Sequence, residues 1–405
     1  MTEQLDVRPA PRRTAVAGPR NGGSGPGRLT VTLCRDPAAF DALAADWNAL
    51  YARCPAATPF QHHAWLHSWW LSYGTPGRLR LVLVREGDAL VGAAPLMLVH
   101  RPYPVLVPLG GDISDFCDVL VDSTQQDRVL RALTEGLLRA ARGALVDLRE
   151  VRPGGMAELL HERWPGARLR NPDSVCLELP CAPLEDLLER MPKPSARRTR
   201  GKLRKLDALG IEHRSVPPEE VPAAVDTLLR LHGLQWQGRG VTPEHLRPRF
   251  RDHLVRAAAE MARTGNALLT EYLLDGEVLA ADVTLMSAGL SGGYLYGAHP
   301  ELRAKADITT MLLRHDARYA ADTGRGVLSM LRGTEPYKRH WRPVEVVNQR
   351  LLLARTELAP VLRAYAAQRA VRTRLAGTVR DRAPGLPAVH ARLRERCRRF
   401  APGRG

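Results

Sequence analysis

The sequence is poor in the residues that build metal centres, disulfide frameworks and membrane spans. No pair of its cysteines forms CxxC, and no Cys/His set has the spacing of zinc ligands. Scattered thiols in a chain of this size are typical of a reducing compartment. No apolar run reaches the roughly 18 residues of a membrane span, and the N-terminus has no secretory apolar core. We therefore expect a cytoplasmic protein without a metal. The six cysteines are Cys34, Cys54, Cys117, Cys176, Cys181 and Cys397.

Sequence signatures of several enzyme classes are also missing. The chain has no Walker loop, no Rossmann glycine fingerprint and no nucleophile elbow leading from a strand into a helix. NTPase, dehydrogenase and serine-hydrolase functions therefore have no support. Aromatic residues are scarce as well, at 5% of the chain, so each cluster of them is a notable feature.

The positive charge is unevenly distributed over the 405 residues. The formal net charge is +16. Residues 1–28 hold five Arg against two acids, and residues 354–405 hold thirteen Arg against three acids. Residues 29–353 therefore carry only about +3. A uniformly basic nucleic-acid groove is not indicated for this central part.

The residue pattern divides the chain into four parts. Residues 1–28 are too poor in large apolar residues to fold, and residues 354–405 read as a basic helical tail. Residues 29–180 and 181–353 have the same order of predicted helices and strands, and the length suffices for two such domains. The hairpins LVLVREGDALVGAAPLML and LLTEYLLDGEVLAADVTLM occupy matching positions. We interpret this as an internal duplication.

Two basic helices are expected. The first covers residues 194–210, where seven cations and no acid occur from Lys193 to Lys205. It either binds tRNA or another anionic polymer, or it is a solvated helix face. The tail has apolar residues at helical spacing among its arginines, so it either lies on the inner face of an anionic membrane or docks on the protein's own core. These apolar residues are Val389, Leu393, Cys397 and Phe400.

The second half has the pattern of a known fold. Strand, DGE turn, strand, SGG turn, strand and helix follow one another, and this order resembles the core of the GNAT acyltransferases. A narrower resemblance covers most of residues 195–342 and is similar to the CelD-type branch, often described as involved in cellulose biosynthesis. It rests on SARRTRGKLRKLDALG, LHGLQWQGRG, LLDGEVLAADVTL, YLYGAHPE and RGTEPYKRHW. The first half matches more loosely, through GGDISDFCDVL, and tandem GNAT folds also resemble the Fem-type ligases that depend on aminoacyl-tRNA.

This resemblance implies a fold and a reaction. The fold is α/β, with two tandem GNAT-like domains that each have a mixed central sheet flanked by helices. The reaction is N- or O-acyl transfer, acetyl first, from acetyl-CoA or another acyl-CoA to a small-molecule or glycan acceptor. One alternative is a Fem-like aminoacyltransferase, which takes its aminoacyl group from charged tRNA. We rank tRNA below CoA as the molecule that carries the acyl group. Another is a non-catalytic accessory protein of polysaccharide biosynthesis, because RAKADITT lacks the family's usual Gly and Ser329 stands where the family usually has Asp.

The catalytic candidates lie in two places. Acyl transfer needs a base for the acceptor's proton and benefits from an acid at the leaving group. We expect Glu335 to be the base and Tyr337 the acid, and Asp282, within a strand, to accept from the substrate amine. The alternative is a structural corner in which Glu335 pairs with Arg332 or Lys338.

A phosphate site is expected at the helix that follows the three-strand unit. Arg303 and Lys305 precede a predicted helix N-terminus, where cations are unusual and where free N–H groups attract phosphate. Lys338 is a further cation for this role. The alternative is a solvated loop. The backbone contacts would come from Ala306, Asp307 and Ile308.

The acceptor is expected between the two halves. Asp115 and Asp118 in GGDISDFCDVL are candidates for a cationic or polyol acceptor, although such residues also form caps and turns. His232 and Trp236 lie four apart on a helix, where they either wall the acceptor site or form one packing ridge. Tyr296 in YLYGAHPE completes the predicted substrate contacts.

Overall fold

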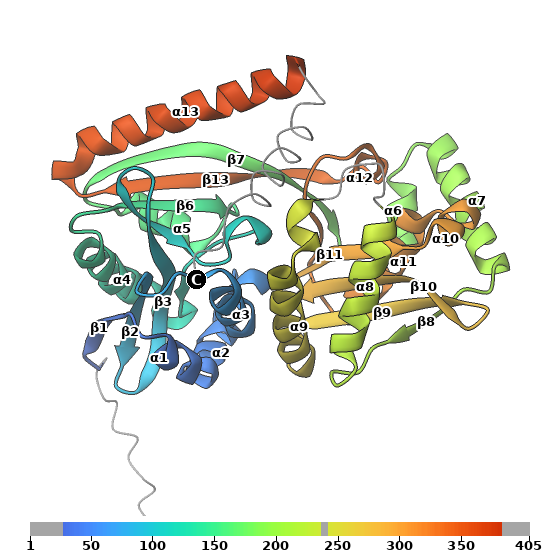
Figure 1. Cartoon of the computed structure of the whole chain (residues 1–405), viewed down its shortest axis with the longest axis horizontal. Helices are drawn as coiled ribbons and strands as arrows, with labels where there is room; N and C mark the ends of the chain where they lie inside the picture. Colours follow the sequence, from blue (N-terminus) through green and yellow to red (C-terminus); the bar gives the residue numbers. More distant parts are fainter. Residues whose placement is uncertain (1–26, 236–241, 383–405) are drawn as a thin grey trace, which may run out of the picture.

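The computed structural model of the chain describes residues 27–235 and 242–382, which form two halves joined through one sheet (Figure 1). The strands of the first half are β1 (Leu29–Cys34), β2 (Leu79–Glu86), β3 (Ala89–His100), β4 (Pro104–Pro108), β5 (Leu120–Val121), β6 (Leu145–Val151) and β7 (Ala167–Pro180). Its helices are α1 (Pro37–Ala42), α2 (Ala44–Ala52), α3 (His63–Tyr73), α4 (Gln126–Ala140) and α5 (Met156–Glu162).

The second half repeats this alternation of helices and strands. Its strands are β8 (Glu212–Ser215), β9 (Ala267–Leu274), β10 (Glu277–Met286), β11 (Leu290–Ala298), β12 (Val327–Arg332) and β13 (Val344–Ala354). Its helices are α6 (Leu184–Glu189), α7 (Lys193–Ala208), α8 (Val221–Gln235), α9 (Pro248–Arg263), α10 (Pro300–Lys305), α11 (Ile308–Asp322) and α12 (Pro336–Arg339), followed by α13 (Ala359–Arg382).

One mixed sheet runs through both halves. Its strand order is β1-β2-β3-β4-β6-β13-β7-β12-β11-β10-β9-β8, and β5 pairs with β3 off this path. From either edge, a run of antiparallel strands leads inward to one parallel pair, β4 with β6 in the first half and β11 with β12 in the second. The predicted α/β fold, with a mixed sheet flanked by helices in two halves, is confirmed.

The two halves exchange strands at the centre of the sheet. β13 lies between β6 and β7, and β7 lies between β13 and β12. β13 runs antiparallel to β7 from Val344 opposite Glu178 to Ala354 opposite Ala167. The last strand of the second half thus completes the sheet of the first half, and the bounds 29–180 and 181–353 stay a prediction.

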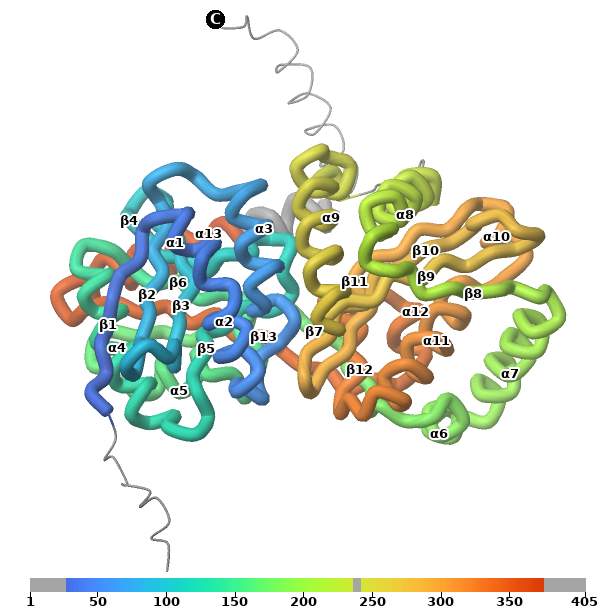
Figure 2. The backbone as a smooth tube through the Cα atoms, turned by 90° about the horizontal axis from the view of Figure 1, so that it is seen from below, coloured from blue at the N-terminus to red at the C-terminus, as the bar shows by residue number. Residues whose placement is uncertain are grey.

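The helices divide between the two faces of the sheet. α1, α2 and α3 share one continuous apolar core with α8 and α9, so this core crosses from one half to the other. α3 and α9 lie side by side at the junction (Figure 2), where Ser68 Oγ donates to His253 O at 2.9 Å. On the other face, α4 and α5 pack over the first half, and α6, α7, α10 and α11 pack over the second.

The tail begins as a docked helix. Tyr365 on α13 donates from its hydroxyl to Asp147 at 2.6 Å, and Arg350 on β13 binds the same carboxylate through two nitrogens at 2.7 and 2.9 Å. α13 therefore lies along β7 and β13 (Figure 1). The apolar residues expected on the tail helix lie outside the described residues. None of the helices within residues 27–235 and 242–382 is long and apolar enough to span a membrane.

The close approach of α8 to β11 predicts a sensitive glycine. A Cβ on Gly297 would lie 2.3 Å from His232 N and 2.6 Å from Leu228 O, so α8 would have to move. We expect Gly297→Ala to lower the free energy of unfolding by about 1–3 kcal/mol, the usual effect of overpacking. Chemical denaturation measures this loss. Gly143→Ala is the control, since a Cβ there meets nothing within 4 Å, and similar losses in both variants would contradict the prediction.

Candidate active site

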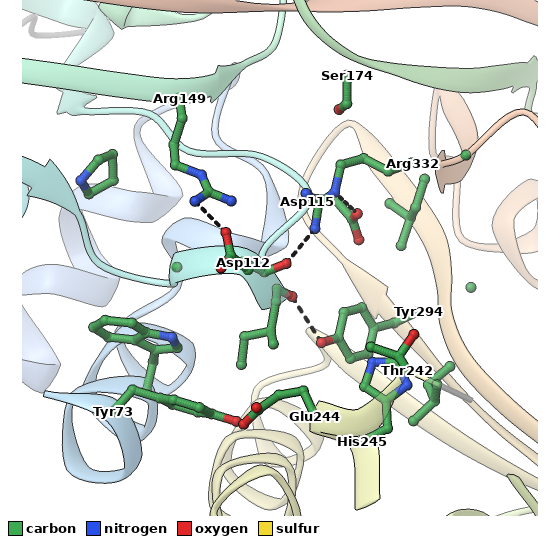
Figure 3. A pocket seen from close by; sticks show the side chains of 18 of the residues that line it. Tyr73, Asp112, Asp115, Arg149, Ser174, Thr242, Glu244, His245, Tyr294 and Arg332 are labelled. Atoms are coloured by element: carbon green, nitrogen blue, oxygen red, sulfur yellow. Dashed lines mark hydrogen bonds and ion pairs between the residues drawn. The ribbon is translucent and has the colours of Figure 1, made fainter. Parts of the chain in front are cut away.

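A large cavity of about 920 Å³ lies between the two halves (Figure 3). We call it the large cavity. The first half contributes residues of β3 and β4 and the turn at Gly111–Ile113, and the second half contributes β11, β12 and the turn at Pro243–Leu246. Since both halves line it, its shape depends on how the central strands hold the halves together.

Arg332 joins the two halves at the wall of the large cavity. Its Nη2 donates to the Asp112 carbonyl oxygen at 2.7 Å, and its guanidinium also pairs with the Asp115 and Glu150 carboxylates. Arg149 pairs with the Asp112 carboxylate on the same wall (Figure 3). Arg332 opens the RGTEPYKRHW motif, and from the sequence we expected it only as a possible partner of Glu335.

The second half has a gap in its sheet beside the large cavity. The parallel pairing of β11 with β12 ends at Gly292 opposite Ser329. Past this point a smaller cavity of about 80 Å³ lies between the strands, with Leu312 and Leu313 of α11 in its lining. We call it the wedge cavity. Gly293 and several further residues line both cavities, so the two adjoin. The other shared residues are Leu295, Tyr296, Met330, Tyr337 and Lys338.

A β-bulge lies where the gap begins. Val283 of β10 faces Leu295 while Thr284 faces Gly293, so Tyr294 is the extra residue on β11. Its hydroxyl donates to the Ile113 carbonyl oxygen of the first half at 2.9 Å (Figure 3). Bulges bend a strand and re-aim side chains, and they are frequent next to active sites.

Two buried carboxyl groups line the wedge cavity. Asp282 on β10 is 3% exposed and Asp316 on α11 is 8% exposed. Thr284 Oγ1 donates to Asp316 Oδ1 at 3.0 Å. Asp282 Oδ1 is fully enclosed and accepts no hydrogen bond of normal geometry, and the hydroxyl groups of Thr270, Tyr272 and Thr284 surround the Asp282 carboxyl. Burial, and then repulsion from Asp316, raise the pKa of Asp282 well above its ordinary value, and burial also raises the pKa of Asp316.

Asp316 was missed in the sequence, although a signal exists. α11 is apolar on the face toward the sheet, and Asp316 belongs to that buried face. A carboxylate within an apolar helix face must find a partner or serve a site. Asp282 is a candidate on the same grounds, and the structure brings the two residues together. The buried apolar residues of this face include Leu312, Leu313, Ala317 and Ala320.

The RGTEPYKRHW motif supplies further residues to the large cavity. Glu335, Tyr337 and Lys338 all line it. The Glu335 side chain is 51% exposed and pairs with Lys338 Nζ at 3.0 Å, and Lys338 Nζ also donates to the Arg332 carbonyl oxygen at 2.8 Å. Burial raises the pKa of Tyr337, so its hydroxyl stays protonated and can donate. The three predicted residues are therefore together, and the ion pair with Lys338 is the one expected for a structural corner.

The residues predicted to bind phosphate lie in a different arrangement from the one expected in the sequence. The helical conformation is interrupted between α10 and α11. Arg303 and Lys305 therefore lie in the last turn of α10 and not just before the start of a helix. Asp307 caps α11 by accepting from Thr310 N at 2.9 Å. Burial opposes its ionisation, but hydrogen bonds from Lys202 and Thr310 lower the pKa of Asp307 to about 2. Its carboxylate therefore already sits at this helix terminus, which does not favour the expected phosphate contact of Ala306, Asp307 and Ile308.

Cations nearby offer a different phosphate site. A groove of about 210 Å³ runs between α7 and α10, and we call it the basic groove. Four cations line it together with Asp307, and Lys305 pairs with Glu301 on its own helix. Asp307 is two residues before Thr309, which lines the wedge cavity, so the groove and the wedge cavity both adjoin the start of α11. The four cations are Lys202, Lys205, Arg303 and Lys305.

The predicted acceptor contacts have different positions. Asp115, His232 and Tyr296 line the large cavity, and His232 Nδ1 is hydrogen-bonded to the Tyr296 carbonyl oxygen at 2.7 Å. Asp118 does not line it: its carboxylate accepts from Met156 N and Ala157 N and thus caps α5. Trp236 lies outside the described residues. In the part of the chain that the structure describes, no group of three or more His, Cys, Asp or Glu side chains could hold a metal ion.

Comparison with known proteins gives a domain match for part of the chain. Residues 194–339, a little over a third of the sequence, match the model of the acetyltransferase (GNAT) domain. This segment contains the wedge cavity and the whole GNAT-like unit recognised in the sequence, apart from the end of RGTEPYKRHW. No curated protein matches the chain.

Solved structures show the same fold in other proteins. FemX is similar at a TM-score of 0.57 and 12% identity, over 76% of this chain and 95% of that chain. The C-terminal domain of a putative lysylphosphatidylglycerol synthetase from Agrobacterium fabrum gives 0.51 and 11%, over 81% and 95%. L-PGS from Bacillus licheniformis gives 0.50 and 13%, over 81% and 94%. At these identities the likeness extends to the fold alone, and the CelD-type branch stays a prediction.

The raised pKa of Asp316 predicts a pH-dependent stability. Between the ordinary pKa near 4 and the raised folded value, the folded protein keeps a proton that the unfolded chain releases. The free energy of unfolding therefore falls as the pH rises through this range. Asp316→Asn removes this titration. We therefore expect the melting temperature of the variant, relative to that of the native protein, to be higher at about pH 8 than at about pH 5.

Calorimetry at both pH values measures this change. Asp322→Asn is the control, since Asp322 lies on the same helix with a side chain that is 70% exposed. A difference between the Asp316 variant and the native protein that stays constant with pH would contradict the raised pKa.

Proposed function

We propose that the chain transfers an acyl group from an acyl-CoA in the wedge cavity to an amine or hydroxyl acceptor in the large cavity. The observation that carries this proposal is the end of the β11–β12 ladder at Gly292 and Ser329, which leaves a gap adjoining the large cavity. A slender chain can enter such a gap without breaking any strand pairing. The match of residues 194–339 to a GNAT domain supports the same reaction class.

The donor's two ends would have different environments. Its phosphates would lie in the basic groove, where Lys205 and Arg303 are exposed and can reorient toward an anion. Its apolar arm would follow α11 past Leu312 and Leu313. The thioester would then reach Gly293, where the wedge cavity meets the large cavity.

Residues around the large cavity would carry out the transfer. As the acceptor's nitrogen or oxygen bonds to the carbonyl carbon, it gives a proton to Glu335, directly or through water. The bond between carbon and sulfur breaks, Tyr337 donates a hydrogen bond to the leaving sulfur, and the thiolate takes its proton from solvent. Asp115 and Arg332 present charges of both signs to the acceptor, which suits a polar small molecule or glycan.

The second candidate function is the transfer of an aminoacyl group from a charged tRNA. The exposed cations of α7 favour it, among them Arg197, Arg198 and Lys202. Binding of tRNA there would weaken steeply with salt, since it releases counterions. Melting temperatures measured with CoA and with tRNA separate the two donors. A shift with neither would favour the accessory role.

The basic groove gives a test of phosphate binding. We expect Lys205→Met with Arg303→Met to weaken CoA binding about tenfold, because two charge-assisted contacts with phosphate are lost. Binding of pantetheine, which has no phosphate, should stay the same. Calorimetric titration measures both affinities. Arg131→Met with Arg142→Met, which replaces exposed cations of the first half, is the control. Equal CoA affinity in both double variants would exclude the groove.

Replacing Glu335 tests the base. We expect Glu335→Gln to lower kcat about 100-fold, within the usual contribution of a general base, and to leave the affinity for CoA unchanged. Turnover is followed by the release of free thiol with a panel of amine acceptors. Glu345→Gln is the matched control, because Glu345 is an exposed partner of Arg339 outside both cavities. Undiminished turnover would mean that another group is the base.

A further inference from the structure

We propose that His245 binds the acceptor, with its Nε2 atom accepting a hydrogen bond from an O–H or N–H group other than the one that is acylated. His232 is the positioning residue that keeps this nitrogen an acceptor. The inference rests on the proposed function and names its acceptor class. That class is an amine or alcohol with a second hydrogen-bond donor, as in amino alcohols and sugars.

The position of His232 follows from the gap in the sheet. Past Gly292, β11 is paired with β10 but no longer with β12, so backbone groups of β11 need other partners. Helix α8 supplies two of them. His232 Nδ1 is hydrogen-bonded to the Tyr296 carbonyl oxygen at 2.7 Å. Gln235 Oε1 accepts from Ala298 N at 3.0 Å. His232 is thus fixed beside Tyr296, which lines both cavities.

His245 lies on the wall of the large cavity that the second half forms (Figure 3). Its ring stacks on the fully buried Phe250, with ring centroids 4.6 Å apart and planes at 29°. Its Nδ1 atom lies 3.2 Å from His232 Nε2. Among the described residues, none is hydrogen-bonded to His245 Nε2, and this atom is not enclosed by protein. A molecule in the large cavity can therefore reach it.

The two hydrogen bonds can run in only one direction when both rings are neutral. A carbonyl oxygen only accepts, so His232 Nδ1 carries the hydrogen and His232 Nε2 has a lone pair. His245 Nδ1 must then donate to that lone pair, which leaves His245 Nε2 as an acceptor. An O–H or N–H group of the substrate fits there, whereas a carboxylate or phosphate oxygen would meet a second lone pair.

The surroundings keep both rings neutral. Burial, and then the nearby His232, lower the pKa of His245 to about 4, and burial also lowers the pKa of His232. The acid next in the sequence, Glu244, would favour a charged ring, but Arg249 binds its carboxylate through two nitrogens at 2.6 and 2.8 Å. Near pH 7.5 His245 therefore presents a lone pair and not a positive charge.

Nitrogen-15 NMR of the full chain, labelled at histidine, tests this arrangement without any substrate. For each neutral ring the spectrum shows which nitrogen carries the hydrogen, and His245→Phe and His232→Leu identify the signals. Near pH 7.5 we expect the hydrogen on Nδ1 in both rings. In His232→Leu, His245 Nδ1 loses its acceptor, so the hydrogen should shift to Nε2 in a large share of the molecules.

Matched substrates test the hydrogen bond itself. They are linear amino alcohols of increasing length and the alkylamines in which a methyl group replaces the hydroxyl. With acetyl-CoA as donor, we expect the amino alcohol of one length to exceed its alkylamine in kcat/KM about tenfold, because the alkylamine leaves the acceptor nitrogen unpaired.

A variant locates this preference. His245→Phe keeps an aromatic ring over Phe250 and should reduce the ratio of the two kcat/KM values to about twofold or less, with unchanged affinity for CoA. His213→Phe, on the exposed edge strand β8, is the matched control and should keep the full ratio. Where a variant fails to fold, the hydrogen positions and the ratio in the native protein decide.

The outcomes separate this inference from the proposed function. If CoA binds but His245 carries its hydrogen on Nε2, the assignment is wrong and acyl transfer stands. An advantage of the amino alcohol that persists in His245→Phe, or no advantage at any length, would also overturn the assignment. If CoA does not bind and no amine is acylated, the proposed function fails together with this inference.

Discussion

The position of β13 between β6 and β7 is the constraint on which the rest of the structure depends. Backbone hydrogen bonds along these strands hold the two halves in one sheet, so neither half can turn against the other without breaking the ladder. The large cavity lies where the halves meet, and its shape therefore follows from strand pairing rather than from the packing of two separate domains. Asp147 and Arg350 extend the same constraint to α13, because the carboxylate that binds Arg350 also accepts from Tyr365.

The RGTEPYKRHW motif combines structural and cavity-facing residues. Arg332 reaches the first half, and Trp341 is buried in the core beneath α6 and α7. Between them, Glu335, Tyr337 and Lys338 face the large cavity. Gly333 has a φ of 112°, a conformation that favours glycine, and a Cβ there would meet the Glu335 carboxylate at 2.5 Å. The rigid ends of the motif thus fix the residues between them, which explains the density of functional groups in so short a segment.

Much of the fold could be predicted from the sequence, and less of the site. The matching hairpins and the order of strands indicated two GNAT-like halves, because apolar periodicity and turn residues are local signals. The exchange of β13 could not be predicted, since a continuous apolar run such as its LLLA end fits any neighbouring strand equally well. The role of Asp307 is open for a related reason: an acid before a helix is a cap in one context and part of a phosphate site in another, and the structure shows the cap. Asp316, like Asp282, is a carboxyl group among apolar residues and could have been chosen on that ground. It lies on a later helix, however, and only the fold brings the two residues together.

Two departures from the pattern that the CelD-type resemblance implies lie beside the wedge cavity, and the structure gives both a physical context. Ser329 is buried where the β11–β12 ladder ends, and its Oγ accepts from Leu331 N at 3.2 Å. Ser329 therefore brings no carboxyl group to the wedge cavity, whereas Asp282 and Asp316 bring two. The stretch without glycine before α11 places Asp307 at the helix terminus, next to Lys202. Burial raises the pKa values of both carboxyl groups, so keeping them in the protein has a cost in stability. A cost of this kind is expected at functional sites more often than in a core, and it marks the wedge cavity as the place to test for function.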